Sequence, residues 1–417
     1  MCKIIKSVLH VVCQEFRLSL STIADDAGLS LARVQGIHGG APCDDREIWA
    51  LAKTLRLADG SAFAEDAQWY DEPVRMLTRR AEFQQLSQES CLRVYQLSQT
   101  ARSLEFLRQR QAMGSTWGRF LEARDALQLP SLGMERTPWQ QGERLAKALR
   151  KALGLRDDPI ASMRDLVMDR FPGLTLLYGT LGQDGPEALL FADNSRGVTI
   201  ALNLDVAKNG LSVVRRFNLA HELCHALVDV GRQRPLAHMT RHLDEAHLEI
   251  EQRANAFAVR FLCPPSVLRE YLERLKEPRV VAKQLVLDYG LPYTAVRNYL
   301  RHTSDCLLPF QPDLPAHLDR WDHAESVPGM ENFPVQRVPM EYRTDMARVA
   351  TELFLYGDAT RQQLAHNLGL SEDDPVEDVP RFLLGSGNPA VLFAELRAML
   401  TDGESAVESG WPGERGA

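Results

Sequence analysis

The 417-residue sequence lacks any apolar run of about 20 residues, the length that a membrane-spanning helix needs. Its first residues, MCKIIKSVLHVVCQEF, hold a brief apolar run interrupted by His10, and no small-residue cleavage site follows. Both features argue against a membrane span and a secretory signal peptide. We therefore expect no membrane partner.

Cysteine pairs are also lacking, because the seven cysteines at positions 2, 13, 43, 91, 224, 263 and 306 include no C-x-x-C. This spacing indicates neither a disulfide framework nor a cysteine zinc site. A reducing cytoplasm is the compartment that fits best.

Charge is unevenly spread, although the formal net charge is only −8. Residues 75–125 hold nine arginines against five acidic residues, whereas residues 313–417 hold 19 acidic residues against eight arginines. This asymmetry suggests different partners for different segments, although a charged stretch is usually only a solvated face. The length predicts two to four domains.

A short motif, HELCH at residues 221–225, points to chemistry. On a helix, residues i and i+4 share one face, so His221 and His225 can hold one cation between them. Glu222 is then placed to act as general base toward water that the metal activates. This is the H-E-x-x-H pattern of zinc hydrolases.

The residues around the motif predict an amphipathic helix. Ser212 is the predicted N-cap and Gly231 the predicted C-cap. The predicted buried stripe consists of Val213, Phe217, Ala220, Cys224 and Leu227. The alternative is an amphipathic helix whose two histidines are solvated or lie in the core.

A catalytic zinc site needs a third protein ligand, and a second helical pattern offers Glu251. That helix is predicted to end at Pro264-Pro265. Its predicted buried face is Ala254, Phe257, Ala258, Phe261 and Leu262. His247 is an alternative ligand or a proton donor, and Glu249 fits the pattern less well. Tyr289 and Tyr293 are further candidates for stabilising an oxyanion.

Three β-like runs precede the motif, at residues 174–181, 187–194 and 197–205. Zinc peptidases generally place a strand beside the metal helix, where an extended peptide can pair with its edge. We expect residues 197–205 to be that edge.

Together, AHELCH and EQRANAFAVRFLCP resemble the paired motifs of the ImmA/IrrE metallopeptidases, over roughly residues 140–270. The resemblance implies a zincin-like core at residues 136–270 with Zn²⁺ bound by His221, His225 and Glu251, and Glu222 as base. Cys263 departs from the methionine common before the proline, which concerns packing. Cys224 is interpreted as a small core residue.

The first 60 residues resemble an Xre/Cro-type helix-turn-helix domain, with Ala24, Gly28, Leu29, Val34 and Ile37 at its packing and turn positions. Candidate DNA contacts are Arg33, Gln35 and His38. Residues 1–60 carry seven basic and seven acidic side chains, so they lack the excess of positive charge that binding to DNA phosphates usually needs. A helical bundle that docks to a protein is therefore the alternative.

The remaining segments are predicted to be mostly helical, which makes the fold class α+β with a large excess of α. Residues 61–135 are interpreted as a helical connector, either a spacer or a homodimer contact. Residues 271–305 repeat the helix-turn-helix spacing with Gly290, Leu291, Val296 and Tyr299, either as a DNA reader or as a structural helix pair. Residues 306–340 are proline-rich and predicted to be a linker or irregular wrap. Residues 341–417 are predicted to be an acidic helical region with a disordered tail from Thr401.

Two functions remain open at this point. The first is a zinc-dependent, site-specific endopeptidase; the family resemblance implies that it cleaves an Xre-type transcriptional repressor in stress response, mobile-element control or phage defence. The second is a non-enzymatic transcription regulator or antitoxin-like protein with a structural or vestigial metal site. The presence of all four chemical groups favours the enzyme.

Overall fold

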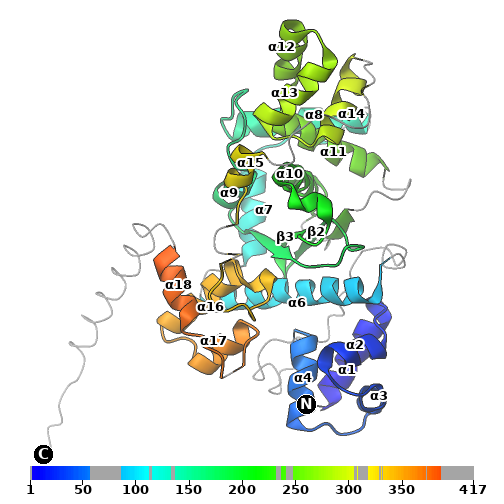
Figure 1. The fold of residues 1–417 in the computed structure, drawn as a ribbon, viewed down its shortest axis with the longest axis vertical. Helices are drawn as coiled ribbons and strands as arrows, with labels where there is room; N and C mark the ends of the chain where they lie inside the picture. Colours follow the sequence, from blue (N-terminus) through cyan, green and yellow to red (C-terminus); the bar gives the residue numbers. More distant parts are fainter. Residues whose placement is uncertain are drawn as a thin grey trace, which may run out of the picture. The chain divides into compact units, whose positions relative to one another are not determined.

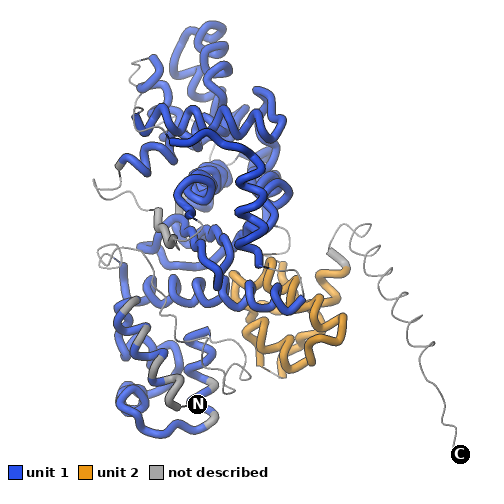
Figure 2. Tube along the Cα trace, turned by 180° about the vertical axis from the view of Figure 1, so that it is seen from behind, with its two compact units in different colours: residues 1–327 blue, residues 328–417 orange. Residues whose placement is uncertain are grey.

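The computed structural model describes residues 2–56, 86–111, 115–132, 137–231, 236–240, 248–304, 308, 318–327, 330, 332–371 and 373–386. The chain divides into two compact units, Met1–Val327 and Pro328–Ala417, coloured separately in Figure 2. The division falls inside the predicted linker at 306–340. His247 and the predicted disordered tail from Thr401 lie outside the described residues.

The first unit begins with four helices: α1 (Cys2–Glu15), α2 (Leu20–Ala27), α3 (Leu31–Gly39) and α4 (Asp45–Thr54). Gly28 ends α2 in the left-handed conformation, with φ of 63°, and the Ser30 side chain caps α3. Ala24, Val34 and Ile37 are buried, as the pattern predicted. Cys43 forms a disulfide, which the cysteine spacing did not predict. Cys13, Cys91, Cys224 and Cys263 are free thiols.

Helix α6 (Gln88–Arg110) is buried on nearly all sides. It contacts the N-terminal bundle, where Gln96 donates to the carbonyl of Thr54 at 2.7 Å and the rings of Phe16 and Tyr95 meet edge to face. On the sheet side its Ser98 accepts from Arg196. This part of the predicted connector is helical, as expected, and it is buried on more than one side.

A four-stranded mixed sheet forms the centre of the unit, with strand order β1-β3-β2-β4. All three predicted strands form, as β1 (Leu174–Gly179), β2 (Ala188–Asp193) and β3 (Gly197–Asn203). The fourth, β4 (Leu236–Thr240), was not predicted. β1 runs parallel to β3, and β2 runs antiparallel to both β3 and β4. β3 therefore lies between two strands, and the prediction that residues 197–205 form an edge is wrong.

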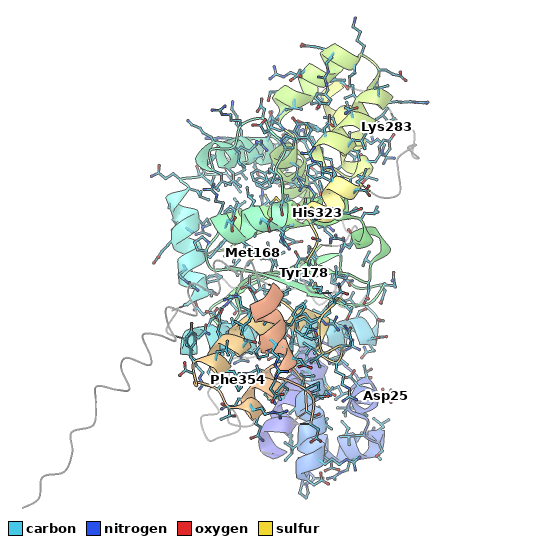
Figure 3. The ribbon with its side chains drawn as sticks, turned by 60° about the vertical axis from the view of Figure 1, so that its left-hand side comes forward. Asp25, Met168, Tyr178, Lys283, His323 and Phe354 are labelled. Atoms are coloured by element: carbon cyan, nitrogen blue, oxygen red, sulfur yellow. The ribbon has the colours of Figure 1, made fainter. Side chains whose placement is uncertain are left out.

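Helices cover both faces of this sheet, which explains why its first three strands are buried almost throughout. Helix α10 (Ser212–Val228) packs on β2 and β3 on one face, and α6 runs along the other (Figure 1). Arg108 of α6 donates to Thr175 of β1. Tyr178, labelled in Figure 3, is three positions further along β1 and points to the opposite face.

The other helices around the sheet are α7 (Thr116–Ala126), α9 (Met163–Arg170) and the 3-10 helix η3 (Ala207–Gly210). Helix α7 packs on β1 and β3, and α9 packs on β1 and α10. The turn η3 leads directly into α10.

Helix α8 (Pro138–Ala152) packs along α11 (Leu248–Leu262) over most of its length. Their closest approach is at Gly142, where an added Cβ would lie 2.7 Å from the backbone nitrogen of Phe257 and closer still to the carbonyl of Arg253. A glycine is therefore required for this spacing.

Three further helices follow: α12 (Pro265–Leu275), α13 (Pro278–Tyr289) and α14 (Tyr293–Ser304). Gly290 ends α13 with φ of 64°, and Leu291, Val296 and Tyr299 are buried. A Cβ at Gly290 would lie 2.8 Å from both Arg216 Nε and Trp321 Cδ2. This turn therefore packs against the core.

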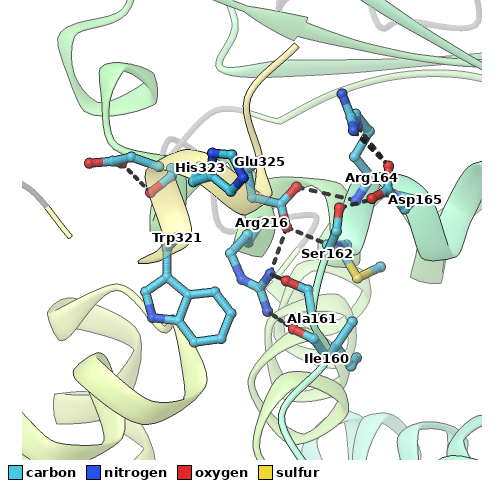
Figure 4. A network of polar contacts seen from close by, with 12 residues as sticks. Ile160, Ala161, Ser162, Arg164, Asp165, Arg216, Trp321, His323 and Glu325 are labelled. Atoms are coloured by element: carbon cyan, nitrogen blue, oxygen red, sulfur yellow. Dashed lines mark hydrogen bonds and ion pairs between the residues drawn. The ribbon is translucent and has the colours of Figure 1, made fainter. Parts of the chain in front are cut away.

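Residues 318–325, within the predicted linker or irregular wrap, contact the first unit through the buried side chains of Trp321 and Glu325. Helix α15 (Asp319–Ala324) buries Trp321 under the guanidinium of Arg216, which lies 4.1 Å from the ring centre (Figure 4). Ser212 donates to Asp322 at 2.6 Å. Among the described residues, no helix is long and apolar enough to cross a membrane.

The second unit is helical, as predicted for this region. It contains η5 (Met340–Tyr342), α16 (Asp345–Leu355), α17 (Arg361–Asn367) and α18 (Asp378–Ser386). Helix α16 packs on both α17 and α18, and its Met346, Ala350 and Leu353 are buried. Thr360 and Gln363 form a capping box at the start of α17.

Candidate metal centre

Helix α10 carries the HELCH motif in a fully buried position. It begins at Ser212 with Leu211 as the N-cap and ends at Val228 with Asp229 as the C-cap, so the predicted caps Ser212 and Gly231 are both wrong. The Ser212 hydroxyl donates to Asp322 instead of capping the helix. The predicted stripe is largely confirmed, since Val213, Ala220, Cys224 and Leu227 are buried and Phe217 is half-buried.

Helix α11 brings the third side chain to the motif. Its predicted buried face is confirmed, because Ala254, Phe257, Ala258, Phe261 and Leu262 are at most 1% exposed. Burial of that face packs α11 on α10 and α8 and turns Glu251 toward the two histidines. Glu249, in the first turn of α11, is exposed and is not part of the cluster.

The donor atoms of His221, His225 and Glu251 converge on one point. The two Nε2 atoms are 3.1 Å apart, and the Glu251 carboxylate lies 3.1 Å from Nε2 of His221 and 3.4 Å from Nε2 of His225. In a tetrahedral zinc site with bonds near 2.0–2.1 Å, neighbouring ligand atoms are about 3.3 Å apart. The spacing and the donor set of two imidazoles and a carboxylate therefore fit Zn²⁺.

The other ring nitrogen of each histidine is held by a neighbouring side chain. Nδ1 of His221 lies 3.1 Å from Oδ1 of Asn255, and Nδ1 of His225 lies 2.8 Å from Oδ2 of Asp229. When Nδ1 carries the hydrogen and donates it, Nε2 has its lone pair available for a metal. Both rings are thus oriented for coordination through Nε2.

The electrostatics of the cluster favour a bound cation. Burial disfavours charge on His225, but hydrogen bonds to Asp229 and Glu251 and the nearby Glu222 carboxylate outweigh it and raise the pKa of His225 to about 10. For Asp229, burial also opposes ionisation, yet His225 and Arg253 hold the pKa of its carboxyl below the ordinary value. A proton or a metal ion can satisfy this demand for positive charge.

Helix α10 is anchored by a buried network around Arg216, shown in Figure 4. Arg216 donates to Glu325 at 2.6 Å and to the carbonyl of Ile160 at 2.7 Å. Glu325 in turn accepts from the backbone nitrogen of Met163 at 2.6 Å, at the start of α9. This network connects the metal helix to α9 and α15.

The two tyrosine candidates lie in the helices that follow the cluster. Tyr289 donates its hydroxyl to the carbonyl of Asp157 at 3.0 Å. Tyr293 is half-buried at the start of α14. Their roles in stabilising an oxyanion, and that of His247, stay predictions.

The three DNA-contact candidates on α3 differ in their surroundings. Arg33 forms an ion pair with Glu47 and donates to the carbonyl of Pro42 at 2.6 Å. Gln35 is exposed, and His38 is half-buried beside the ring of His10, with ring centres 6.0 Å apart. DNA binding by this unit stays a prediction.

Asn255, Asp229 and Arg253 are residues of the site that the sequence analysis missed. The sequence spacing could have identified Asn255 and Asp229. Asp229 lies four positions after His225, and Asn255 lies four positions after Glu251, so each pair shares one helix face. Arg253 on α11 forms an ion pair with Asp229 at the end of α10, and the sequence spacing of the two residues does not predict this contact between helices.

No curated protein matches the sequence. Residues 211–301 match a family model described as the IrrE N-terminal-like domain, Peptidase_M78. The matched segment runs from the start of α10 into α14 and contains His221, Glu222, His225 and Glu251. It extends beyond the expected end at residue 270 and covers most of the second helix-turn-helix-like pair. The match supports an ImmA/IrrE-type metallopeptidase domain in this part of the chain.

Proposed function

We propose that the protein is a zinc-dependent endopeptidase in which His221, His225 and Glu251 hold the ion and Glu222 is the general base. The observation that carries this proposal is the convergence of the three donor atoms from two successive helices. Both ring orientations support it, because Nδ1 of each histidine is engaged and Nε2 faces Glu251.

The number of donors favours a catalytic site over a structural one. Among the described residues the cluster has three protein donors, whereas structural zinc sites are usually closed by four. This observation favours the enzyme over the non-enzymatic regulator. A zinc ion bound here would supply Lewis acidity, which polarises a carbonyl oxygen and lowers the pKa of a water molecule.

Glu222 supplies the proton transfer in this proposal. It follows His221 directly on α10, is fully buried, and interacts electrostatically with His225, which places its carboxylate near the donor cluster in a water-poor setting. There its carboxylate accepts a proton from the attacking water and passes it to the amine of the leaving peptide.

We assign the substrate-binding edge to β4 in place of β3. β4 pairs with β2 on one side and is an outer strand of the described sheet. It also follows the metal helix directly in the chain, with seven residues between the end of α10 and the start of β4. A peptide added to this edge would be held by main-chain hydrogen bonds, independently of its side chains.

The biological target proposed here is an Xre-type repressor, in stress response, mobile-element control or phage defence; this proposal rests on the resemblance. The first 54 residues would guide the enzyme by binding DNA or a protein, with Gln35 the most accessible of the three candidates. Homodimer formation and a cytoplasmic location belong to the same proposal.

Peptidase activity is tested by co-expressing the protein with Xre-type regulators encoded beside its gene and analysing their fragments by mass spectrometry. We expect Glu222→Gln to lower the cleavage rate by about 10²–10⁴-fold while metal binding is retained, because only the base is removed. Glu249→Gln is the matched control and should cleave normally, since Glu249 is exposed and outside the cluster. A product formed equally well by Glu222→Gln would contradict the proposed base.

DNA binding is tested separately by electrophoretic mobility shift of the full chain over a range of salt concentrations. Binding that weakens steeply with salt would support DNA recognition, because phosphate contacts release counterions. The absence of a shift at low salt would assign the N-terminal bundle to protein docking.

A further inference from the structure

We propose that Asp229 and Arg253 are positioning residues for the metal ligand His225, with Arg253 acting through Asp229. This inference rests on the proposed metal site. It concerns neither a ligand nor the general base.

Asp229 is placed at the end of the helix that it serves. It is the C-cap residue of α10, four positions after His225, and its Oδ2 accepts from Nδ1 of that histidine at 2.8 Å. A hydrogen bond from a ligating histidine to a carboxylate fixes the ring and its tautomer and increases the basicity of the ligating nitrogen. Asp229 is thus the group that directs Nε2 of His225 to the metal.

The carboxylate of Asp229, at the C-terminal end of α10, needs a partner that stabilises its negative charge and fixes its orientation. The C-terminus of a helix carries a partial negative charge, so a carboxylate there is disfavoured. Arg253 of α11 supplies the restraint through an ion pair from its terminal nitrogen to Oδ1 of Asp229. The two carboxylate oxygens are therefore engaged by different partners, which prevents rotation away from His225.

Arg253 also links the two helices that carry the metal ligands. It lies two positions after Glu251 on α11 and reaches across to the end of α10. The positive charge of Arg253 compensates the negative charge of Asp229. An anionic acceptor can therefore bind Nδ1 of His225 without adding net charge to the site. His221 differs in this respect, because its Nδ1 faces the neutral amide oxygen of Asn255.

The proposal predicts a defined order of metal affinities, measured on the full chain by competition between the protein and a chromophoric chelator for Zn²⁺. Asp229→Ala should lower affinity by about 10–100-fold, as loss of such a partner typically does. Asp229→Asn should lower it less, because the amide oxygen still accepts from Nδ1. The Co²⁺ absorption spectrum should change in Asp229→Ala, since the ligand field depends on how His225 is oriented.

A double variant distinguishes a pair from two independent residues. If Arg253 acts through Asp229, Arg253→Gln should weaken Zn²⁺ binding in the wild-type background and have no further effect beside Asp229→Ala. The matched control is Arg260→Gln, which breaks the ion pair between the buried Arg260 of α11 and the exposed Glu143, 2.8 Å apart, away from the cluster. Control affinity should equal that of the wild type.

The results separate this inference from the proposed function. Wild-type Zn²⁺ affinity and an unchanged Co²⁺ spectrum in both Asp229 variants would overturn the inference and leave the metal site standing. Additive losses for Asp229→Ala and Arg253→Gln would overturn the action of Arg253 through Asp229. Failure of the wild-type protein to bind Zn²⁺ would contradict the metal site itself. Thermal melts of the metal-free variants verify that each has folded.

Discussion

Arg33 of α3 forms an ion pair with Glu47 of α4. The sequence placed it among the DNA-contact candidates, but in the structure Glu47 of α4 binds its guanidinium. This ion pair, with the backbone nitrogen of Asp44, lowers the pKa of Glu47 to about 2. Ionised Glu47 thus stabilises the N-terminal bundle.

The Glu47 contact predicts a dependence of bundle stability on acid. Because its pKa is lower in the folded state than the ordinary 4.5, its contribution is present above about pH 4.5 and lost as the pH falls toward 2. Hydrogen exchange of the peptides covering α3 and α4 measures this. Wild type should lose its protection advantage over Glu47→Gln in that window, and an equal difference at pH 2.5 and pH 7 would refute the assignment.

Spacing within one helix explains which site residues could be predicted. His221, Glu222 and His225 lie in one motif, and Glu251 lies in the next helical pattern, where the family resemblance favoured it over His247 and Glu249. Arg253 and Arg216 could not be found in this way. Their partners, Asp229 and Glu325, are brought near only by packing between elements.

Helix α6 shows why amphipathicity failed as a guide at the scale of elements. A helix covered on several sides has no single apolar stripe, and α6 buries polar residues whose hydrogen bonds are met by other elements. Glu105, for example, accepts from the backbone nitrogen of Thr116 at 3.0 Å. β4 was missed for a different reason, because the strand is only five residues long and its apolar-polar alternation covers only residues 237–240.

The α8–α11 crossing gives a prediction at the same scale. Gly142→Ala should lower the free energy of unfolding by about 1–3 kcal/mol, because the added methyl group meets the backbone of Arg253 and Phe257. It should also weaken Zn²⁺ binding, since α11 carries Glu251. Urea unfolding and chelator competition measure the two effects.

Gly118→Ala is the matched control for this substitution. Gly118 lies within α7, and an added Cβ there meets nothing within 4 Å. Alanine is the better helix former by about 1 kcal/mol, so the control should be neutral or stabilising. Equal destabilisation by both substitutions would show that the Gly142 contact has no special role.

Across the whole molecule, the division between the two units lies after Val327, inside the proline-rich segment predicted at residues 306–340. The part of this segment before the division is attached to the first unit, because Trp321 and Glu325 are buried there. The buried Arg216–Glu325 pair holds this segment to the metal helix. The prediction of this segment used only its proline content, which does not indicate which residues between the prolines are buried.

Loss of this pair should destabilise the first unit strongly. Glu325→Ala leaves the Arg216 charge buried without its carboxylate, and burial already lowers the pKa of that arginine. We expect a loss of about 3–5 kcal/mol in urea unfolding followed by tryptophan fluorescence. Glu270→Gln, which removes an exposed pair with Arg274, should change stability by less than about 1 kcal/mol. A similar small change for Glu325→Ala would contradict the anchoring role.

The most direct test of the metal centre is a crystal structure of the zinc-loaded protein with anomalous scattering recorded at the zinc edge. The account predicts one anomalous peak about 2.0–2.2 Å from Nε2 of His221, Nε2 of His225 and the Glu251 carboxylate, with solvent in the fourth position. A peak closed by a fourth protein ligand, or zinc bound elsewhere with Glu251 turned away, would contradict it.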